Sequence, residues 1–224
     1  SLGQMRMGVW ARLDVVAGIL GLHSDGEACG LGHVVANKGG VGIGLWVWDT
    51  SMAFVASHLA AHQNQTKRRN EDYSEIAGGL KLGRYSNCDL FSQFHHVTWM
   101  GDLNYRLDFN PEVFGEGANS KTPPKELFDT IEKMVQEKQF AELLSYDQLI
   151  KAREQRESFL GFHEGQITHP PTFKVERKKG IQYISERSPA YCDRILWRSF
   201  DTLMSQCSDL WSGNEVSSSD HKPV

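Results

Sequence analysis

Apolar and polar positions along the chain predict a hairpin followed by a separate strand. Residues 40–61 open with an apolar run over 41–48, reach a turn at 49–51, and return through a second apolar run at 53–58. This is the pattern of two paired strands. Residues 97–101, "VTWMG", are rich in β-prone side chains and predict a further strand. We therefore expect a sheet built around these strands.

Two other stretches have helical rather than strand periodicity. Residues 65–80 predict one helix that ends near a glycine pair, and residues 122–155 predict two or three more. Thr122 is the expected cap of the first of these, and Pro123 suits its first turn. The apolar positions of that helix recur at helical spacing, at Leu127, Ile131 and Val135.

The second half of the chain adds strands without a regular alternation of strand and helix. Residues 166–177 and 190–197 predict strands, and residues 217–224 predict a terminal loop. Near the start of the chain, the polar segment 23–30 predicts a turn. Because hairpins dominate, we predict an α/β fold: a two-sheet sandwich of mostly antiparallel strands flanked by helices. The polar ends of three strands would then meet at one edge of this fold.

Composition places this fold in one globular domain. The chain has 224 residues, of which 40% are hydrophobic and 23% are charged, and its formal net charge is −4. That length and apolar content suit a single monomeric domain over residues 1–224 with an ample core. The mild acidity argues against nucleic acid as a partner, although a local basic pocket remains compatible with it.

The cysteines and the apolar runs indicate the compartment. Cys29, Cys88, Cys192 and Cys207 have no CxxC spacing, so we expect buried, reduced thiols rather than a disulfide framework or a zinc site. No apolar run reaches the roughly 20 residues of a membrane span, and no signal peptide opens the chain. We expect a cytoplasmic protein whose two ends are cut from a longer domain.

Polar side chains of catalytic types stand where the apolar runs end. They are His58, Asp102, Asn104, Asp193, Arg194, Asp220 and His221. Their spacing does not match a structural zinc site. Carboxylate oxygens suit a hard cation such as Mg²⁺, a histidine can balance charge on a phosphate oxygen, and a carboxylate can orient a water. The set therefore favours magnesium-dependent phosphoryl transfer.

Each of these residues also has an ordinary structural interpretation. An isolated Asp-x-Asn after a strand is most often a turn with side-chain caps, and a histidine at a strand end is most often a satisfied polar group. Asp193 and Arg194 alone would most often form an ion pair. The motifs together have few structural explanations. Gly101 adds to the case, since it lets the backbone turn tightly and present Asp102 and Asn104 from a rigid element.

These motifs, taken with their neighbours, resemble the catalytic domain of the inositol polyphosphate 5-phosphatases, a branch of the magnesium-dependent endonuclease, exonuclease and phosphatase superfamily. The matching blocks cover nearly the whole chain: "NKGGVGI" (37–43), "SHLAAH" (57–62), "RRNEDY" (68–73), "WMGDLNYR" (99–106), "PPTFK" (170–174), "PAYCDRILW" (189–197) and "SDHKPV" (219–224). The resemblance implies a DNase I-like fold. It also implies Mg²⁺-dependent removal of the 5-phosphate from phosphoinositides or soluble inositol polyphosphates by an activated water.

The resemblance implies a role for each residue at the scissile phosphate. Asp102 would orient or deprotonate the attacking water, and Asn104 would donate to a phosphate oxygen. His58 would contact the same phosphoryl group. Asp193 would fix the tautomer of His221, which stabilises the pentacovalent state.

The metal side of the site is incomplete in this sequence. By resemblance Asp220 lies at the metal, while the family's magnesium-binding glutamate stands on a strand upstream of the region matched here. Glu27 is the nearest acidic candidate, in a segment that does not resemble that strand. Because aspartates alone supply few fixed oxygen ligands, we expect weak magnesium binding and a domain that lacks its N-terminal part.

Basic residues are expected on the substrate side. The resemblance places Lys174 and Arg187 at the 4-phosphate, next to the scissile group, with Arg69 and Asn70 as further substrate-binding residues. Basic side chains suit that task, since arginine can grip phosphate with a forked pair of hydrogen bonds. Phe173 replaces the family's usual tyrosine and cannot donate a hydroxyl. We therefore expect a weakened preference for the 4-phosphate.

Several alternatives stay open. Arg106 is either part of the site or an ion-pair partner behind it. Leu31, Val34 and Val35 form either a buried strand or an apolar lip that touches acyl chains, and the basic run at 175–180 would add weak attraction to an anionic membrane surface. The activity has two alternatives: a nuclease of the same superfamily, which the net acidity disfavours, and a catalytically weak phosphoinositide-binding module, which the intact catalytic set disfavours.

Overall fold

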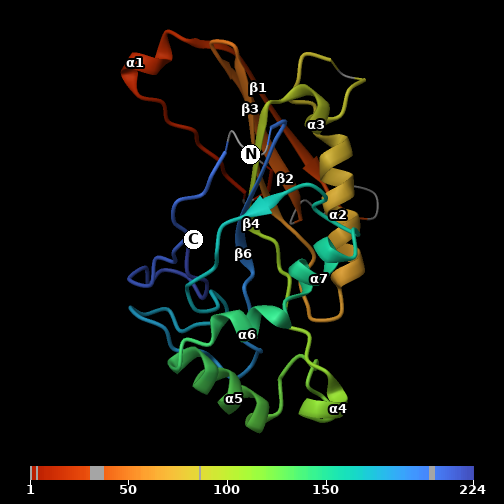
Figure 1. Ribbon diagram of the computed structural model, residues 1–224, viewed down its shortest axis with the longest axis vertical. Coiled ribbons are helices and arrows are strands. Elements are labelled where there is room, and N and C mark those ends of the chain that lie inside the picture. Colours follow the sequence, from red (N-terminus) through yellow and green to blue (C-terminus); the bar gives the residue numbers. More distant parts are fainter. Residues whose placement is uncertain (1, 4, 31–37, 86, 202–204) are drawn as a thin grey trace.

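The computed structural model describes residues 2–3, 5–30, 38–85, 87–201 and 205–224, and a six-stranded sheet runs through its centre (Figure 1). The strands are β1 (Ile19–Ala28), β2 (Gly39–Val47), β3 (Thr50–His58), β4 (His96–Asp102), β5 (His163–Glu164) and β6 (Asp193–Ser199). They are ordered β1-β2-β3-β4-β6-β5 across the sheet. β3 and β4 are parallel, and every other neighbouring pair is antiparallel.

The predicted class, α/β with mostly antiparallel strands and flanking helices, is confirmed. The hairpin is β2–β3, but its turn lies at Trp48 and Asp49, because Thr50 already pairs with Val47. The described residues form one sheet rather than two. Segment 166–177, expected as a strand, makes only isolated bridges, since the consecutive prolines at 170 and 171 have no N–H to donate to a regular ladder.

The turn expected at 23–30 is also wrong, because this polar segment belongs largely to β1. Asp25 pairs with Gly42 and Glu27 with Gly40 across the first two strands. β1 is an edge strand that alternates between exposed and partly buried positions. Polar side chains on such a strand conceal its pairing from a hydrophobicity pattern.

The helices fall where the periodicity predicts them, with short additions. They are α1 (Leu13–Val16), α2 (Thr66–Gly79), α3 (Leu90–Gln93), α4 (Pro111–Phe114), α5 (Lys125–Gln136), α6 (Phe140–Ser145) and α7 (Gln148–Glu154). The Thr122 cap is wrong. α5 begins three residues later, after Pro124, and has no side-chain cap. The Thr122 hydroxyl instead donates to the carbonyl of Glu186 at 3.3 Å.

α2 lies along one face of the sheet, and α4, α5 and α6 gather at one end of the molecule (Figure 1). The helix can approach closely because β2 offers glycines on that face. A Cβ at Gly40 would lie 2.6 Å from Ile76 Cγ2. The same face buries Val55, Trp99 and Leu196 completely, so the principal core lies between the sheet and α2.

The opposite face of the sheet is only half-buried. At the ends of β3 and β4 and the start of β6, the side chains on this face are polar. His58 pairs in register with Asp102, and Asp102 pairs with Asp193. These three positions therefore lie side by side on adjacent strands. The expected convergence of strand ends at one edge is confirmed.

Candidate active site

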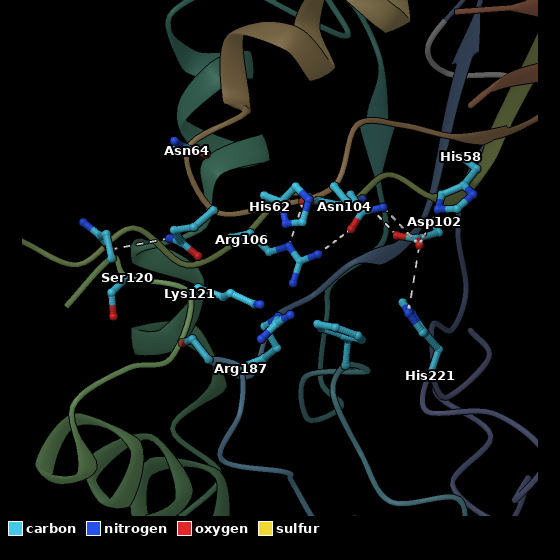
Figure 2. A pocket seen from close by; sticks show the side chains of 15 residues that line it. His58, His62, Asn64, Asp102, Asn104, Arg106, Ser120, Lys121, Arg187 and His221 are labelled. Carbon is cyan, nitrogen blue, oxygen red and sulfur yellow. Dashed lines mark hydrogen bonds and ion pairs between the residues drawn. The ribbon is translucent and has the colours of Figure 1, made fainter. Parts of the chain in front are cut away.

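Asp102 is at the centre of a cluster at this sheet edge (Figure 2). Its Oδ2 atom lies 3.3 Å from His58 Nε2, 3.1 Å from Asn104 Nδ2 and 4.0 Å from His221 Nε2. His221 in turn places Nδ1 2.9 Å from Asp193 Oδ2. The structure thus brings together the five residues that the sequence assigns to the scissile phosphate.

The backbone after β4 is shaped to hold Asp102 in this place. Gly101 has φ of 130°, and a Cβ there would lie 2.1 Å from the Ser57 carbonyl oxygen. A side chain at this position would meet rigid backbone, so only glycine fits. The Leu59 N–H donates to the Asp102 carbonyl at 3.1 Å, which ties the ends of β3 and β4 together.

Asn104 lines the cleft and also holds Asp102 in position. Its Nδ2 donates to the Leu59 carbonyl and to Asp102 Oδ2, at 3.1 Å each, which uses both amide hydrogens. Arg106 donates to the Asn104 side-chain oxygen and fixes the orientation of the amide. In this arrangement both hydrogens of that amide have protein partners, and the donor role expected for Asn104 stays a prediction.

Opposite charges within the cluster stabilise one another. Burial opposes ionisation of Asp102, but the hydrogen bond from His58 and the positive charges of His221 and Lys38 outweigh it and hold the Asp102 pKa below its ordinary value. Burial lowers the pKa of His221, yet its hydrogen bond with Asp193 and the charge of that carboxylate raise it above the ordinary value. The electrostatics of the cluster therefore favour an ionised Asp102 beside a protonated His221.

Two residues of this cluster have no assigned role in the sequence. Lys38 Nζ contacts His58 Nε2, and burial lowers the pKa of this amine. Thr172 Oγ1 donates to Asp193 Oδ2 at 2.6 Å. Both lie in matching blocks, "NKGGVGI" and "PPTFK", which was the only available signal for either.

The cluster forms one end of a cleft with a volume of about 650 Å³. Arg106 lies midway along it, with its guanidinium 4.6 Å from the centre of the Phe173 ring and its Nε donating to the Asn104 carbonyl at 3.0 Å. Among the described residues no carboxylate pairs with Arg106, so its ion-pair alternative is wrong. Lys121 and Arg187 lie toward the other end (Figure 2).

Lys174 does not line the cleft, although it was expected at the substrate. Its Nζ lies 2.7 Å from Glu186 Oε2, in an ion pair beside the cleft wall. Arg187 does line the cleft, as expected. Arg187 thus lines the cleft while Lys174 pairs with the residue next to it in sequence, and the 4-phosphate role expected for both stays a prediction.

Arg69 and Asn70 are structural rather than substrate-binding, because both are buried away from the cleft. Arg69 donates to the carbonyls of Ala60 and His62, at 3.1 and 2.7 Å, and to the side chain of Gln148. Burial lowers its pKa to about 10. Arg69 thus anchors the loop between β3 and α2, which forms one wall of the cleft. Asn70 instead donates to Glu157 at 3.1 Å and accepts from the Tyr105 hydroxyl at 2.6 Å.

The cluster contains neither Asp220, which the resemblance places at the metal, nor Glu27, the nearest acidic candidate in the sequence. The Asp220 carboxylate lies 3.7 Å from Arg177 Nη2 and is outside the cluster. Glu27 lies against Gly79 of α2, on the covered face of the sheet: a Cβ on that glycine would be 2.4 Å from Glu27 Oε2. Neither residue adds a ligand to the Asp102 edge.

The remaining donor set still fits a divalent cation. Ligand-type atoms of Asp102, Asp193 and His221 lie within 4.8 Å of one another. Mg²⁺ is usually held by one or two carboxylates and completes its octahedron with waters and substrate phosphates. Asp102 and Asp193 can supply those two carboxylates.

Other expectations resolve away from the site. Arg194 forms buried ion pairs with Asp147 and Glu164, at 2.9 and 2.7 Å, and not with Asp193, its partner in the ordinary interpretation. All four cysteines are free, but Cys88 is exposed and Cys207 only partly buried, so the expectation of four buried thiols is wrong. Leu31, Val34 and Val35 lie outside the described residues. None of the described helices has the length and apolar character to cross a membrane.

Comparisons with known proteins agree with this geometry. A family model described as endonuclease/exonuclease/phosphatase family 2 matches residues 1–224. Phosphatidylinositol 3,4,5-trisphosphate 5-phosphatase 1 of Homo sapiens and 5-phosphatase 2B of Danio rerio are each 32% identical over 235 residues, covering 100% of this chain but 19% and 18% of those proteins. The chain therefore spans about a fifth of the length of these relatives.

A solved structure extends the likeness to three dimensions. The inositol polyphosphate 5-phosphatase domain of SpSynaptojanin, in complex with inositol (1,4)-bisphosphate and calcium ion, is 29% identical with a TM-score of 0.75, over 93% of this chain and 54% of that one. A Cimex nitrophorin, at 19% identity and a TM-score of 0.63, shares the fold. With the family model matched along the whole chain, this protein belongs to endonuclease/exonuclease/phosphatase family 2, and within it the chain is similar to inositol polyphosphate 5-phosphatases.

Proposed function

We propose that this chain is a catalytic domain that removes the 5-phosphate from phosphoinositides or soluble inositol polyphosphates. The observation that carries the proposal is the Asp102 cluster: a carboxylate between two histidines, at the end of a cleft with basic side chains. The relatives that are named phosphatidylinositol 3,4,5-trisphosphate 5-phosphatases support the same reaction class.

The roles of the side chains follow from their contacts. Asp102, kept ionised by its neighbours, orients the attacking water and accepts its proton. His58 and His221 present N–H groups to the phosphoryl oxygens, where negative charge gathers during transfer. Asp193 and Thr172 hold His221 in a fixed orientation. Asn104 and Arg106 hold the Asp102 carboxylate.

The metal that we propose for this site is Mg²⁺. Asp102 and Asp193 would hold it, as hard oxygen ligands. When bound, the cation would supply positive charge at the phosphoryl oxygens and lower the pKa of a nearby water. Calcium occupies the SpSynaptojanin complex, which supports a divalent ion in this fold.

We also propose that the domain works as a monomer at the membrane surface, where phosphoinositide head groups are exposed. The basic run at 175–180 supports this, since cationic side chains are attracted to anionic leaflets.

Phosphate release tests the proposal directly. The substrates are vesicles containing phosphatidylinositol 3,4,5-trisphosphate, soluble inositol 1,4,5-trisphosphate, and abasic DNA as the nuclease substrate, each with Mg²⁺ and with EDTA. We expect Mg²⁺-dependent release of phosphate from at least one of the inositol phosphates and no cleavage of the DNA. DNA cleavage without phosphate release would instead identify a nuclease, and headgroup binding without turnover would identify a binding module.

A further inference from the structure

The lining of the cleft changes in character between its two ends. One end is the charged cluster around Asp102, and the other carries the cations of Lys121 and Arg187. Two loops supply neutral, polar side chains to the remaining lining (Figure 2). The loop between β3 and α2 contributes His62, Gln63 and Asn64, and the loop between α4 and α5 contributes Asn119 and Ser120. Imidazole, amide and hydroxyl groups pair well with neutral hydroxyls, so this part of the cleft suits the unphosphorylated positions of a polyol.

Two of the three side chains on the first loop already have partners. Gln63 Nε2 donates to the Leu107 carbonyl at 2.6 Å and to Asn119 Oδ1 at 3.5 Å, which braces the two loops against each other. The side-chain oxygen of Asn64 accepts from the neighbouring glutamine at 3.2 Å. His62 differs from both, because its side chain is exposed in the cleft and forms no hydrogen bond with another described residue. Its ring nitrogens can therefore serve a ligand.

The backbone of His62 is held in a conformation that favours glycine. Its φ is 79°, in the left-handed region that side chains with a Cβ adopt at a cost. The fully buried Arg69 donates to the His62 carbonyl at 2.7 Å and fixes this conformation from behind the loop. Backbone strain of this kind is concentrated at sites that hold ligands. An imidazole is thus presented to the cleft at a position where glycine would relieve the strain.

The chemistry of the imidazole indicates which part of a ligand it meets. A neutral imidazole has one donor and one acceptor nitrogen, and a hydroxyl group likewise both donates and accepts. A phosphate dianion offers acceptors alone and is better matched by the cations at the end of the cleft. His62 therefore complements a free hydroxyl rather than a phosphate.

We propose that His62 is a specificity-determining residue that hydrogen-bonds a free hydroxyl of the polyol ring whose scissile phosphate lies at Asp102. The inference rests on the proposed function and adds a contact that recognises the ring itself. A lipid head group and a free inositol phosphate share this chemistry. Substrates whose ring lacks the hydroxyl lose the contact and bind more weakly.

The test uses two ligands with the same pair of adjacent phosphates. Inositol 4,5-bisphosphate has free ring hydroxyls, and trans-cyclohexane-1,2-diyl bisphosphate has none. Both are titrated calorimetrically with Mg²⁺ in an Asp102→Asn background, where turnover does not interfere. We expect His62→Gly to weaken binding of the inositol bisphosphate about fivefold and of the cyclohexane bisphosphate less than about twofold. His62→Asn should restore binding, since asparagine tolerates a positive φ and keeps a donor and an acceptor.

Lys138→Gly is the matched control, because Lys138 is exposed outside the cleft and has a φ of 57°. It relieves the same kind of strain and should leave both affinities unchanged. Glycine adopts a positive φ without steric cost, so we expect both glycine variants to melt no lower than the parent. Equal losses on the two ligands in His62→Gly would overturn the hydroxyl contact, and so would unchanged binding of the inositol bisphosphate.

The binding readout stands apart from the proposed function. Absence of phosphate release by the wild-type domain would refute the activity, while the difference between the two ligands would still decide the hydroxyl contact. In the active background we expect His62→Gly to raise KM and to leave kcat unchanged, as for an interaction made equally in the ground state and the transition state. Vesicles with phosphatidylinositol 4,5-bisphosphate identify the source: a loss on vesicles alone supports contact with a lipid head group, and a loss in solution alone supports contact with a free inositol phosphate.

Discussion

At the scale of single residues, the side chains at the sheet edge act through shared atoms. One oxygen of Asp102 faces His58, Asn104 and His221, and one oxygen of Asp193 faces both His221 and Thr172. A carboxylate that accepts several hydrogen bonds stays ionised and fixed in orientation. Changes at these residues should therefore affect chemistry far more than folding.

Asp102→Asn tests this at the central carboxylate. The amide has the same shape but lacks the charge that orients water and accepts a proton, so we expect kcat to fall by about 10² to 10⁴. Asp108→Asn is the matched control, because Asp108 lies outside the cleft and pairs with Lys151. Steady-state kinetics and thermal melting measure the two effects. Near wild-type turnover in a folded Asp102→Asn variant would remove this residue from its role.

Asp193 and His221 should behave as one unit. At saturating Mg²⁺, where weakened metal binding no longer limits turnover, Asp193 acts by orienting His221 and favouring its protonated form. The double variant Asp193→Asn with His221→Ala should then lose about as much activity as the worse single variant. The measurement is a double-mutant cycle on kcat. Losses that multiply would show that the two side chains contribute independently.

The cysteines should divide by burial. Burial raises the pKa of Cys29 to about 12, with nearby Asp72 and Glu75 adding to the effect, and burial also raises that of Cys192. At pH 8 only about one Cys29 in ten thousand would be thiolate, the form that reacts. We expect a thiol reagent to label Cys88 quickly, Cys207 more slowly, and the other two only after denaturation. Mass spectrometry of digested protein identifies the sites, and fast labelling of Cys29 in the folded protein would contradict the burial.

At the scale of elements, α2 shows how a motif can be recognised and its role misassigned. "RRNEDY" identifies the family, but the sequence does not show which side of the helix faces the cleft. Arg69 is fully buried and holds the carbonyls of the loop between β3 and α2. Its guanidinium supports the loop that forms the cleft wall and lies outside the space where a substrate would bind.

Arg69→Met separates these roles. Loss of the guanidinium leaves buried carbonyls unsatisfied, so we expect the free energy of unfolding to fall by about 2 to 4 kcal/mol. KM of the variant should stay close to wild type at temperatures where it is folded. Lys67→Met is the control, since this neighbouring lysine is exposed. A large rise in KM with unchanged stability would restore Arg69 to the substrate.

Local patterns predicted those elements that carry a strong period, such as the β2–β3 hairpin and α5. They failed where the structure depends on neighbours. β1 carries polar side chains because it is an edge strand with exposed positions. Segment 166–177 forms no regular strand ladder because its prolines have no N–H to donate in a hydrogen bond. The strand-end residues of the site could be predicted because their types are unusual in such places. Lys121 could not, because a lone lysine in a loop carries no signal until the fold brings it to the cleft. Thr172 had only its place in the block "PPTFK", and its contact with Asp193 appears only in the fold.

At the scale of the whole molecule, the cleft joins segments that are distant in sequence. One end is the edge formed by β3, β4 and β6, and the other combines the loop before α5 with the segment of Arg187. A phosphorylated ring bound across the cleft would bring phosphate oxygens to the carboxylate end while its other groups meet the basic end. Metal and substrate binding should therefore be coupled.

That coupling gives the last prediction. Asp102 and Asp193 are the two carboxylates of the cluster among the described residues, and Mg²⁺ needs six oxygen ligands. We expect weak Mg²⁺ binding by the free domain, with a Kd in the millimolar range, which corresponds to a binding free energy of about −4 kcal/mol. Inositol 1,4-bisphosphate should tighten it several-fold, because its phosphates supply missing ligands. By linkage, Mg²⁺ must tighten the bisphosphate by the same factor.

Calorimetric titration of each ligand, with and without the other, measures both factors and requires them to agree. Asp193→Asn should weaken Mg²⁺ binding and reduce the coupling. Glu27→Gln should leave both unchanged, because Glu27 lies against Gly79 on the covered face of the sheet. Micromolar Mg²⁺ binding by the free domain would mean that the two aspartates are joined by a further strong ligand. Loss of that binding in the Glu27→Gln variant would show that Glu27 of β1 is this further ligand, and would contradict its position against Gly79.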